Sequence, residues 1–242
     1  MGEGLVIGLA IVVGLVIAFL IGSIPGGVIV GKVMGGIDIR KHGSGNIGTT
    51  NSLRLLGWKG GALVCVLDIL KGVCGGLVML GIIHALGGAF AALQAGGASA
   101  QTVDLIVDWA RGGALMLTTL GHMYSPFLKF KGGKGIATSF GGFCVLCPWC
   151  ALASLVAFLL GCFLTKYVSI GSMAGAVGYL LCTIFVYNQH MPWIVVAVIV
   201  TAVVFYAHRG NIGRLARGEE SRFSVGSKKT IEEAREKEQQ GK

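Results

Sequence analysis

Long apolar segments, separated by short polar stretches, make up most of the 242-residue chain. The first spans about residues 5–30, and Pro25 within it predicts a kink or a break because proline lacks a backbone donor. A second apolar segment spans roughly residues 61–83, and a third ends near Gly121. Each approaches the roughly 20 apolar residues that a helix needs to cross a bilayer. The pattern therefore predicts an all-α polytopic membrane protein.

The second half of the chain continues this pattern. Residues 136–165 are apolar, too long for one straight span and short for two, and Pro148 divides them. Two short helices that meet at Cys147-Pro148 and form a hairpin fit this length best. Two further helices follow at about residues 168–187 and 193–207. The total is about seven transmembrane helices, or five or six if the hairpin is re-entrant, with the N-terminus outside and the C-terminus cytoplasmic.

The segments between these helices differ in character. Two polar cytoplasmic loops are expected at about residues 33–60 and 122–135, whereas the Gly-rich residues 84–110 are expected to form a linker at the outer face. We predict one integral-membrane domain over residues 1–222. The charged residues 223–242 are expected to form a cytoplasmic tail, helical or disordered, to which the sequence assigns no function.

Composition supports the membrane assignment. The chain is 54% hydrophobic and 13% charged, with a mean hydropathy of +0.77, which excludes an ordinary soluble domain. The formal net charge is +9, and all basic residues except Lys71 and Arg111 fall on one predicted face. The positive-inside rule makes that face cytoplasmic. The positive charge therefore needs no nucleic acid to explain it.

Seven cysteines lie in or near the apolar segments. The run Cys144-x-x-Cys147-x-x-Cys150 resembles the spacing of metal ligands, but residues three apart on a helix simply share a face, and a second ligand cluster is missing. Free cysteine behaves as a small buried hydrophobe. We therefore predict packing roles for the cysteines and no metal site.

The first polar loop, residues 40–54, carries the richest chemistry. Gly43, Gly45 and Gly48 free backbone N–H groups from secondary structure, a suitable setting for a phosphate held at a bilayer surface. Arg54 can hold a phosphate by two parallel hydrogen bonds, which lysine cannot. The glycine spacing matches G-x-G-x-x-G, but the strand and crossover helix of a dinucleotide site are missing. An ordinary flexible loop would not need so many further polar side chains, which are Ser44, Asn46, Thr49, Thr50 and Asn51.

The second polar loop, residues 130–135, contains Lys131 and Lys134 among Gly132, Gly133 and Gly135. The glycines permit close backbone approach to a ligand, and a helix starting near residue 136 would direct its positive end at a bound anion. The loop lacks the spacing of a Walker P-loop. A basic loop that only sets topology would explain the lysines but not the glycines.

Five further polar residues need separate weighing. His208 and Asn211 are three apart after the last helix and could face the same site, or simply anchor the helix end. His122 ends the third helix beside the second polar loop, where a helix-capping role is the plain alternative. Asp68 and Lys71, also three apart within an apolar segment, are expected to pair with each other or with neighbours, because isolated charge at that depth is costly.

In this order, these motifs resemble those of the bacterial acyl-phosphate:glycerol-3-phosphate acyltransferases of phospholipid synthesis. The resemblance covers roughly residues 5–222. The matching segments are Gly22-Ser-Ile-Pro, Gly43-Ser-Gly-Asn-x-Gly-x-Thr-Asn, Asp68-x-x-Lys-Gly, Gly121-His, Phe130-Lys-Gly-Gly-Lys-Gly-x-Ala-Thr and His208-x-x-Asn-Ile-x-Arg-Leu. Such enzymes are polytopic inner-membrane proteins, commonly with seven helices, and use no metal or cofactor. The 84–110 linker and the tail appear longer than the family core and inherit no role.

The resemblance implies roles for individual residues. The catalytic centre would contain Ser44, Arg54, Lys134, His208 and Asn211. Substrate binding would involve Gly43, Gly45, Asn46, Thr49, Asn51, His122, Lys131, Gly132 and Gly133. Ser169 or Ser172 could also reach this centre.

The resemblance further implies transfer of a fatty acyl group from acyl phosphate to the 1-hydroxyl of glycerol 3-phosphate. The protein would be a monomer in the bacterial cytoplasmic membrane, with the bilayer as its only other partner and the site facing the cytoplasm. None of the five histidines has an aspartate five positions later, so the His-x4-Asp dyad of acyl-CoA-dependent acyltransferases is missing. His208 or a phosphate oxygen of a substrate could act as the base.

Two other classes of protein fit this pattern less well. A transporter of an anionic solute would place charged residues and broken helices near the midplane, often in repeated halves, whereas here the polar chemistry collects at one face. A purely structural membrane protein would not need the density of Gly, Asn and Arg in the loops. An interfacial enzyme is therefore favoured.

Overall fold

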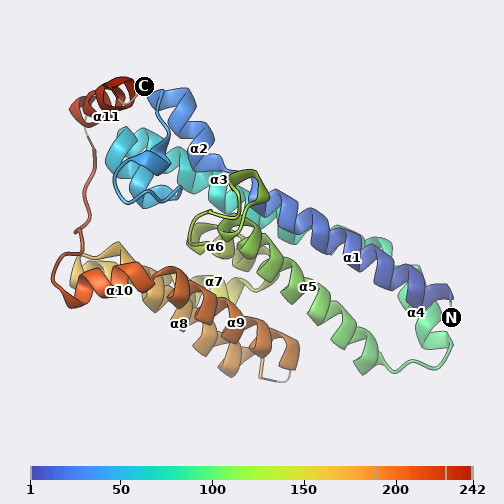
Figure 1. Ribbon diagram of the computed structural model, residues 1–242. Helices are drawn as coiled ribbons and strands as arrows, with labels where there is room; N and C mark the ends of the chain where they lie inside the picture. The colour runs from blue at the N-terminus through green and yellow to red at the C-terminus, as the bar shows by residue number, and fades with distance from the viewer. Residues whose placement is uncertain (1, 189, 227, 241–242) are drawn as a thin grey trace.

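The computed structural model describes residues 2–188, 190–226 and 228–240 (Figure 1). Every regular element within these ranges is a helix, which confirms the predicted all-α class. One group of helices contains α1 (Gly2–Ser23), α3 (Thr49–Ala85) and α5 (Ala100–Met123), which pack against one another. Apolar side chains of α1 such as Leu9 point outward with 58% of their surface exposed. That exposure suits a face in contact with lipid.

The first apolar segment breaks at Pro25, as predicted. After the break, α2 (Gly26–Val30) continues into a single π-helical turn (Gly31–Gly35). Two carbonyl groups freed at the break find side-chain donors: Ser125 Oγ donates to Ser23 O over 2.6 Å, and Lys71 Nζ donates to Ile24 O over 3.1 Å. Neighbouring helices therefore satisfy the backbone that proline leaves open.

Helix α3 begins at Thr49, so the expectation of a cytoplasmic loop up to residue 60 was wrong. A short 3₁₀ turn (Ile39–Lys41) precedes it, and Gly57, with a φ of +71°, separates a first segment from the long apolar span. That φ favours glycine. Leu55 and Leu56 on the short segment are buried against α2 and its π-turn, and this packing makes the segment helical.

The expected outer linker at residues 84–110 is also mostly helical, which corrects that prediction. It contains α4 (Gly87–Ala95) and the first half of α5. Phe90 is buried with Ile7 of α1, and Val103 and Ile106 of α5 pack against them. Small residues hide this helical spacing in the sequence because alanine and glycine carry little hydrophobic contrast.

The predicted division of the apolar segment at Pro148 is confirmed, because α6 (Ile136–Leu146) ends just before it and α7 (Pro148–Thr165) begins there. That the two helices form a hairpin stays a prediction. Helix α6 packs against α3 and α5, whereas α7, α8 (Val168–Val186) and α9 (Met191–Ala207) form a second group, as Figure 1 shows. The core of this group contains Cys147 and Cys150, both buried as predicted, and the rings of Phe143 and Tyr179, stacked 4.0 Å apart.

Four helices of the described residues are long and apolar enough to cross a membrane, or five if α9 and α10 (Arg209–Ala216) count as one span bent by 53°. The four lie within residues 2–35 (α1, α2 and the π-turn), α3, α7 and α8. Helix α6 is shorter, and α5 carries Asp104, Asp108 and Arg111. The protein thus has an integral-membrane fold with four to five such spans.

The charged tail is helical from Lys228 to Gln240, whereas its first residues, 223–226, form no regular element. Helix α11 (Lys228–Gln240) packs against α3, with Ala234 buried there and Arg235 Nε donating to Gly35 O over 2.6 Å. Residues 219–226, which we call the strap, lead from α10 to α11. Within the strap, Phe223 N donates to Lys166 O and Gly226 N donates to Leu53 O. The strap therefore spans the two groups of helices.

Candidate active site

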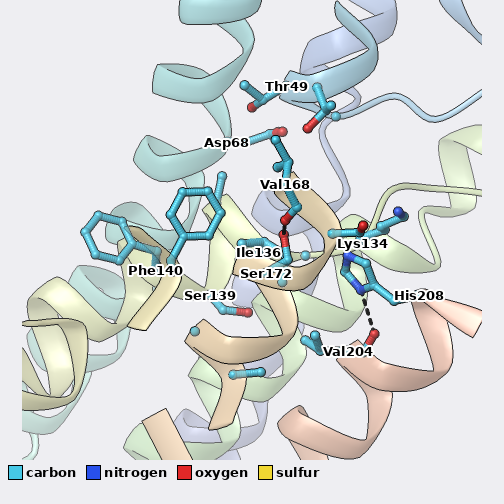
Figure 2. Close-up of a pocket in the computed structure, with 18 of the residues that line it drawn as sticks. Thr49, Asp68, Lys134, Ile136, Ser139, Phe140, Val168, Ser172, Val204 and His208 are labelled. Atoms are coloured by element: carbon cyan, nitrogen blue, oxygen red, sulfur yellow. Dashed lines mark hydrogen bonds between the residues drawn. The ribbon is translucent and has the colours of Figure 1, made fainter. Parts of the chain in front are cut away.

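One cavity of about 310 Å³ lies between the polar loops and the helices α3, α6, α7, α8 and α9 (Figure 2). Polar side chains line the part beside the two loops, and apolar side chains such as Phe140, Phe158 and Tyr179 line the part within the bundle. Ser169 and Ser172, noted from the sequence, also line it. Nine predicted residues reach this cavity: Ser44, Asn46, Thr49, Asn51, Arg54, His122, Lys134, His208 and Asn211.

The first polar loop is held in shape by Asn51, whose side chain is almost fully buried. Its Nδ2 donates to the carbonyl groups of Ile39, His42 and Asn46, while its Oδ1 accepts from Ser44 N. Loop N–H groups that the sequence predicted as phosphate donors are therefore engaged within the loop: Ser44 N by Asn51, Gly45 N by the His42 carbonyl and Gly48 N by Asn46 Oδ1.

The early start of α3 gives the site a different anion-binding feature. The N-terminal turn of α3, which contains Thr49, lines the cavity. The first N–H groups of an α-helix lack partners within the helix, so this end carries partial positive charge. Arg54, one turn further, has its Nε buried with no hydrogen-bond partner in the described part of the chain. The helix end and Arg54 together can hold a phosphate.

The second polar loop folds back onto the end of α5. Gly132 N and Gly133 N donate to the Met123 and His122 carbonyl groups over 2.9 and 3.0 Å. A Cβ atom on either glycine would lie 2.0 Å from an atom of His122, so only glycine permits this approach. The loop then presents Lys134 to the cavity at the start of α6, as Figure 2 shows.

Lys134 belongs to a chain of polar contacts that ends on the strap. Its Nζ donates to Asn211 Oδ1, and Asn211 Nδ2 donates to Glu220 Oε1 over 2.6 Å. Arg214 Nε donates to the second oxygen, Glu220 Oε2, over 2.7 Å. Burial lowers the pKa of Lys134 from 10.5 to about 8, while the charge of Glu220 opposes this and the charges of Arg214 and Arg54 add to it.

His208 lies at the break between α9 and α10 and is 1% exposed. Its Nδ1 is 2.8 Å from the Val204 carbonyl, the dashed contact in Figure 2. A carbonyl can only accept, so Nδ1 carries the proton, and in the neutral ring Nε2 is left as an acceptor. The ring is thereby oriented to accept a proton in the cavity.

Asp68 and Lys71 pair as predicted, with Lys71 Nζ 2.8 Å from Asp68 Oδ1 and both side chains buried. His122 Nδ1 lies 3.5 Å from the same oxygen. Asp68 and His122 also line the cavity. This buried network supports the second polar loop through His122 and the break at Pro25 through Lys71.

Five predicted binding residues do not line the cavity. Lys131 is exposed. The other four are glycines of the two loops that border the cavity, where they support the shapes of the loops. The binding role of these glycines stays a prediction. Sequence reasoning missed Arg214 and Glu220 as parts of the site. Arg214 was quoted only as part of a motif, and Glu220 lies in a Gly-Glu-Glu-Ser stretch with no recognisable spacing. The five residues outside the cavity lining are Lys131, Gly43, Gly45, Gly132 and Gly133.

The described residues contain no group of three His, Cys, Asp or Glu side chains placed to hold a metal ion. The cavity brings together the cations Arg54, Lys134 and Arg214 and the acceptor nitrogen His208 Nε2. Such an arrangement can neutralise phosphate groups and stabilise negative charge that develops nearby. The apolar part of the same cavity suits a hydrocarbon chain.

Comparison with known proteins agrees with this chemistry. The sequence pattern of a family described as glycerol-3-phosphate acyltransferase matches residues 12–218. The chain is 41% identical over 210 residues to a glycerol-3-phosphate acyltransferase of Thermus thermophilus, a match that covers 86% of this chain and 93% of that protein. It is 37% identical over 201 residues to that of Bacillus subtilis, a match that covers 83% and 91%.

The fold is similar to that of PlsY (YgiH), an integral membrane glycerol 3-phosphate acyltransferase. The crystal structure of its glycerol 3-phosphate form matches with a TM-score of 0.74 and 33% identity, over 88% of this chain and 96% of that one. The lysophosphatidic acid form matches with a TM-score of 0.70 and 32% identity, over 88% and 95%.

Proposed function

The chain belongs to the glycerol-3-phosphate acyltransferase family, and from this premise we propose that it transfers a fatty acyl group from acyl phosphate to the 1-hydroxyl of glycerol 3-phosphate. The products are lysophosphatidic acid and inorganic phosphate, in the first acylation step of phospholipid synthesis. One observation carries the proposal: three cations and an acceptor nitrogen converge in a cavity that continues between apolar side chains.

The donor would place its two ends in different parts of the cavity. Tyr179 lies eleven residues after Val168, or roughly 16 Å along α8 at 1.5 Å per residue. The acyl chain would lie in this apolar part, beside Phe158. Its phosphate would lie at the N-terminus of α3, near Arg54, where an anion is favoured. Phosphate is a good leaving group once its charge is neutralised, so no protein nucleophile is required.

The acceptor would enter from the cytoplasmic side. Its phosphate would be held by Lys134, and its primary hydroxyl would attack the acyl carbon. The bond between that carbon and the donor phosphate oxygen breaks, and the hydroxyl proton passes to His208 Nε2 or to a phosphate oxygen. The cations stabilise the charge that develops on the carbonyl oxygen, and the enclosed geometry holds the two substrates together.

The membrane arrangement is part of the same proposal. Helices α5 and α6 would cross or enter the bilayer with the five apolar spans, giving seven, with the N-terminus outside and the C-terminus cytoplasmic. The basic loops and the open end of the site lie at one end of the bundle, where the positive-inside rule favours the cytoplasm of a bacterial cell. As the resemblance to the family implies, the protein would act as a monomer.

Product formation by purified protein tests the function and its donor. The protein, in detergent or lipid, receives glycerol 3-phosphate with either a long-chain acyl phosphate or the matching acyl-CoA. We expect lysophosphatidic acid and released phosphate with acyl phosphate only. Turnover with acyl-CoA alone would overturn the donor assignment. A folded sample that turns over neither donor would favour an anion transporter.

The pKa of Lys134 predicts the alkaline limit of activity. The ammonium form binds phosphate and is lost as pH rises, so kcat/KM for glycerol 3-phosphate should fall above about pH 8, well below the 10.5 of an ordinary lysine. The pH dependence of kcat/KM reports the pKa values of groups in the free enzyme. In Lys134→Arg the positive charge persists to higher pH, so the fall in kcat/KM near pH 8, the alkaline limb of the profile, should disappear. A wild-type profile that stays flat to pH 10 would contradict the assignment.

A further inference from the structure

Glu220 places a carboxylate among the cations of the site, although it lies beyond residue 218, where the family match ends. Its side chain is 6% exposed, and it lines the cavity. Neighbouring Glu219, by contrast, is 57% exposed and pairs with Arg217 over 2.7 Å. Two adjacent glutamates therefore have different environments, and only Glu220 can affect the site directly.

The strap holds Glu220 at this position through contacts with both groups of helices. Glu219 N donates to Arg214 O, and Arg54 Nη2 donates to Ser221 O over 3.3 Å. At the far end, a Cβ atom on Gly226 would lie 1.9 Å from Arg54 O, so only glycine permits the strap to pass so close to α3. These contacts tie the strap to the two arginines that border the cavity.

The contacts of Glu220 determine how Asn211 is oriented. An amide offers one acceptor oxygen and one donor nitrogen, and its two orientations exchange them. Glu220 accepts from Nδ2, which leaves Oδ1 turned toward the Lys134 ammonium. Without a carboxylate at this place, only the Lys134 ammonium would favour this orientation, because an ammonium can only donate. The Asn211 amide would then lose one of its two partners, and its position beside Lys134 would be less fixed.

We propose that Glu220 is a positioning residue of the acyl-transfer site, whose carboxylate fixes the Asn211 amide and Arg214 and thereby holds the Lys134 ammonium in place for a substrate phosphate. The inference rests on the proposed function of this cavity and extends it to the strap. Glu220 itself forms no bond to a reacting atom.

The charges around Lys134 give this role a measurable signature. Arg54 on α3, Arg214 on α10 and His208 at the α9–α10 break surround the lysine, and Glu220 is the anion that opposes them. Burial raises the pKa of the Glu220 carboxyl, but hydrogen bonds from neighbours including Asn211 lower it by more. The net pKa is below its usual value, so the carboxyl is ionised at neutral pH. The Glu220 carboxylate raises the pKa of Lys134, so removing it should lower that pKa.

The test compares Glu220→Gln with Glu219→Gln as a matched control in the full chain. For Glu220→Gln we expect the alkaline limb of kcat/KM for glycerol 3-phosphate to move to lower pH. Relative to its value at pH 6.5, kcat/KM at pH 8 should fall about five- to tenfold further than in wild type, because losing a neighbouring opposite charge moves a pKa by about 1–3. Glu220→Asp should restore part of the wild-type profile, and Glu219→Gln should match wild type.

Two results would overturn the proposal: an unchanged limb in Glu220→Gln, or a higher kcat/KM, as expected if Glu220 merely competed with substrate phosphate. If Glu220→Gln is not recovered folded, Gly226→Ala is measured in its place, because it displaces the strap without changing a charge, and the same shift is expected. If wild type shows no transfer, the proposed function fails separately. Glu220 is then tested by the pH dependence of glycerol 3-phosphate binding alone.

Discussion

Arg54→Ala is expected to lower kcat/KM for acyl transfer by about 10²- to 10³-fold, the loss typical when one preorganised donor to developing charge is removed. Arg54 lines the cavity beside the N-terminus of α3, and its buried Nε has no partner among the described residues, so this donor is available to a substrate oxygen. Initial rates with acyl phosphate and glycerol 3-phosphate measure the effect. Lys134→Ala should lose activity to a similar extent, because it removes the second cation of the same site.

Two further variants separate charge from geometry at this position. Arg54→Lys keeps the positive charge but loses the paired donors, so it should recover only part of the activity. Lys59→Ala removes an exposed cation that does not line the cavity, and it should behave as wild type. Near-wild-type turnover in Arg54→Ala or Lys134→Ala, in protein that elutes as a single folded species, would refute a shared cationic site.

The residues that the sequence predicts for the site come from short, chemically distinctive motifs. Ser44, Arg54, Lys134, His208 and Asn211 all line one cavity, although up to 167 positions separate them along the chain. Glycine-rich polar loops between apolar segments stand out in any membrane sequence. Pro148 within the long apolar segment 136–165 likewise predicted the division into α6 and α7, because proline leaves few local alternatives.

The boundaries that sequence reasoning missed depend on tertiary packing. The segment from Thr49 to Gly57 is too short to be recognised as a helix from its periodicity, and its leucines gain helical order from burial against α2. The helical residues of the 84–110 segment gain order from packing against Ile7 of α1. Neither partner is adjacent in sequence, so no local pattern reports them.

Glu220 illustrates a different limit. Two consecutive glutamates near a basic segment look alike in the sequence, and the tail beyond residue 222 was given no role. Their difference arises from the strap, whose path depends on Gly226 passing the Arg54 carbonyl and on Phe223 meeting Lys166. Long-range backbone contacts of this kind carry no signature in residue type alone. The cationic loops predict where an anion binds, but they do not predict which acidic side chain of the protein lies beside these cations.

Asp68→Ala is expected to lower the free energy of unfolding by about 3–5 kcal/mol, the typical cost of leaving one partner of a buried ion pair without the other. Among the described residues, the Lys71 ammonium, 6% exposed, would keep only the Ile24 carbonyl as a partner. Since that carbonyl lies at the break before Pro25, the loss should also loosen the junction of α1 and α2. Denaturant unfolding in mixed micelles measures the change, and Asp104→Ala, at an exposed position of α5, serves as the control with little effect.

The double variant Asp68→Leu with Lys71→Met separates the pair from its surroundings. Replacing both charges by apolar groups removes the uncompensated ammonium, so the double variant should be destabilised by less than the sum of the two single changes. Its activity should nevertheless stay low, because Ile24 O loses its donor at the break before Pro25, and His122, which contacts the second polar loop, loses the carboxylate 3.5 Å away. Strict additivity of the two single effects would show that the pair is not coupled. Full activity in the double variant would show that the site does not depend on this buried network for its shape.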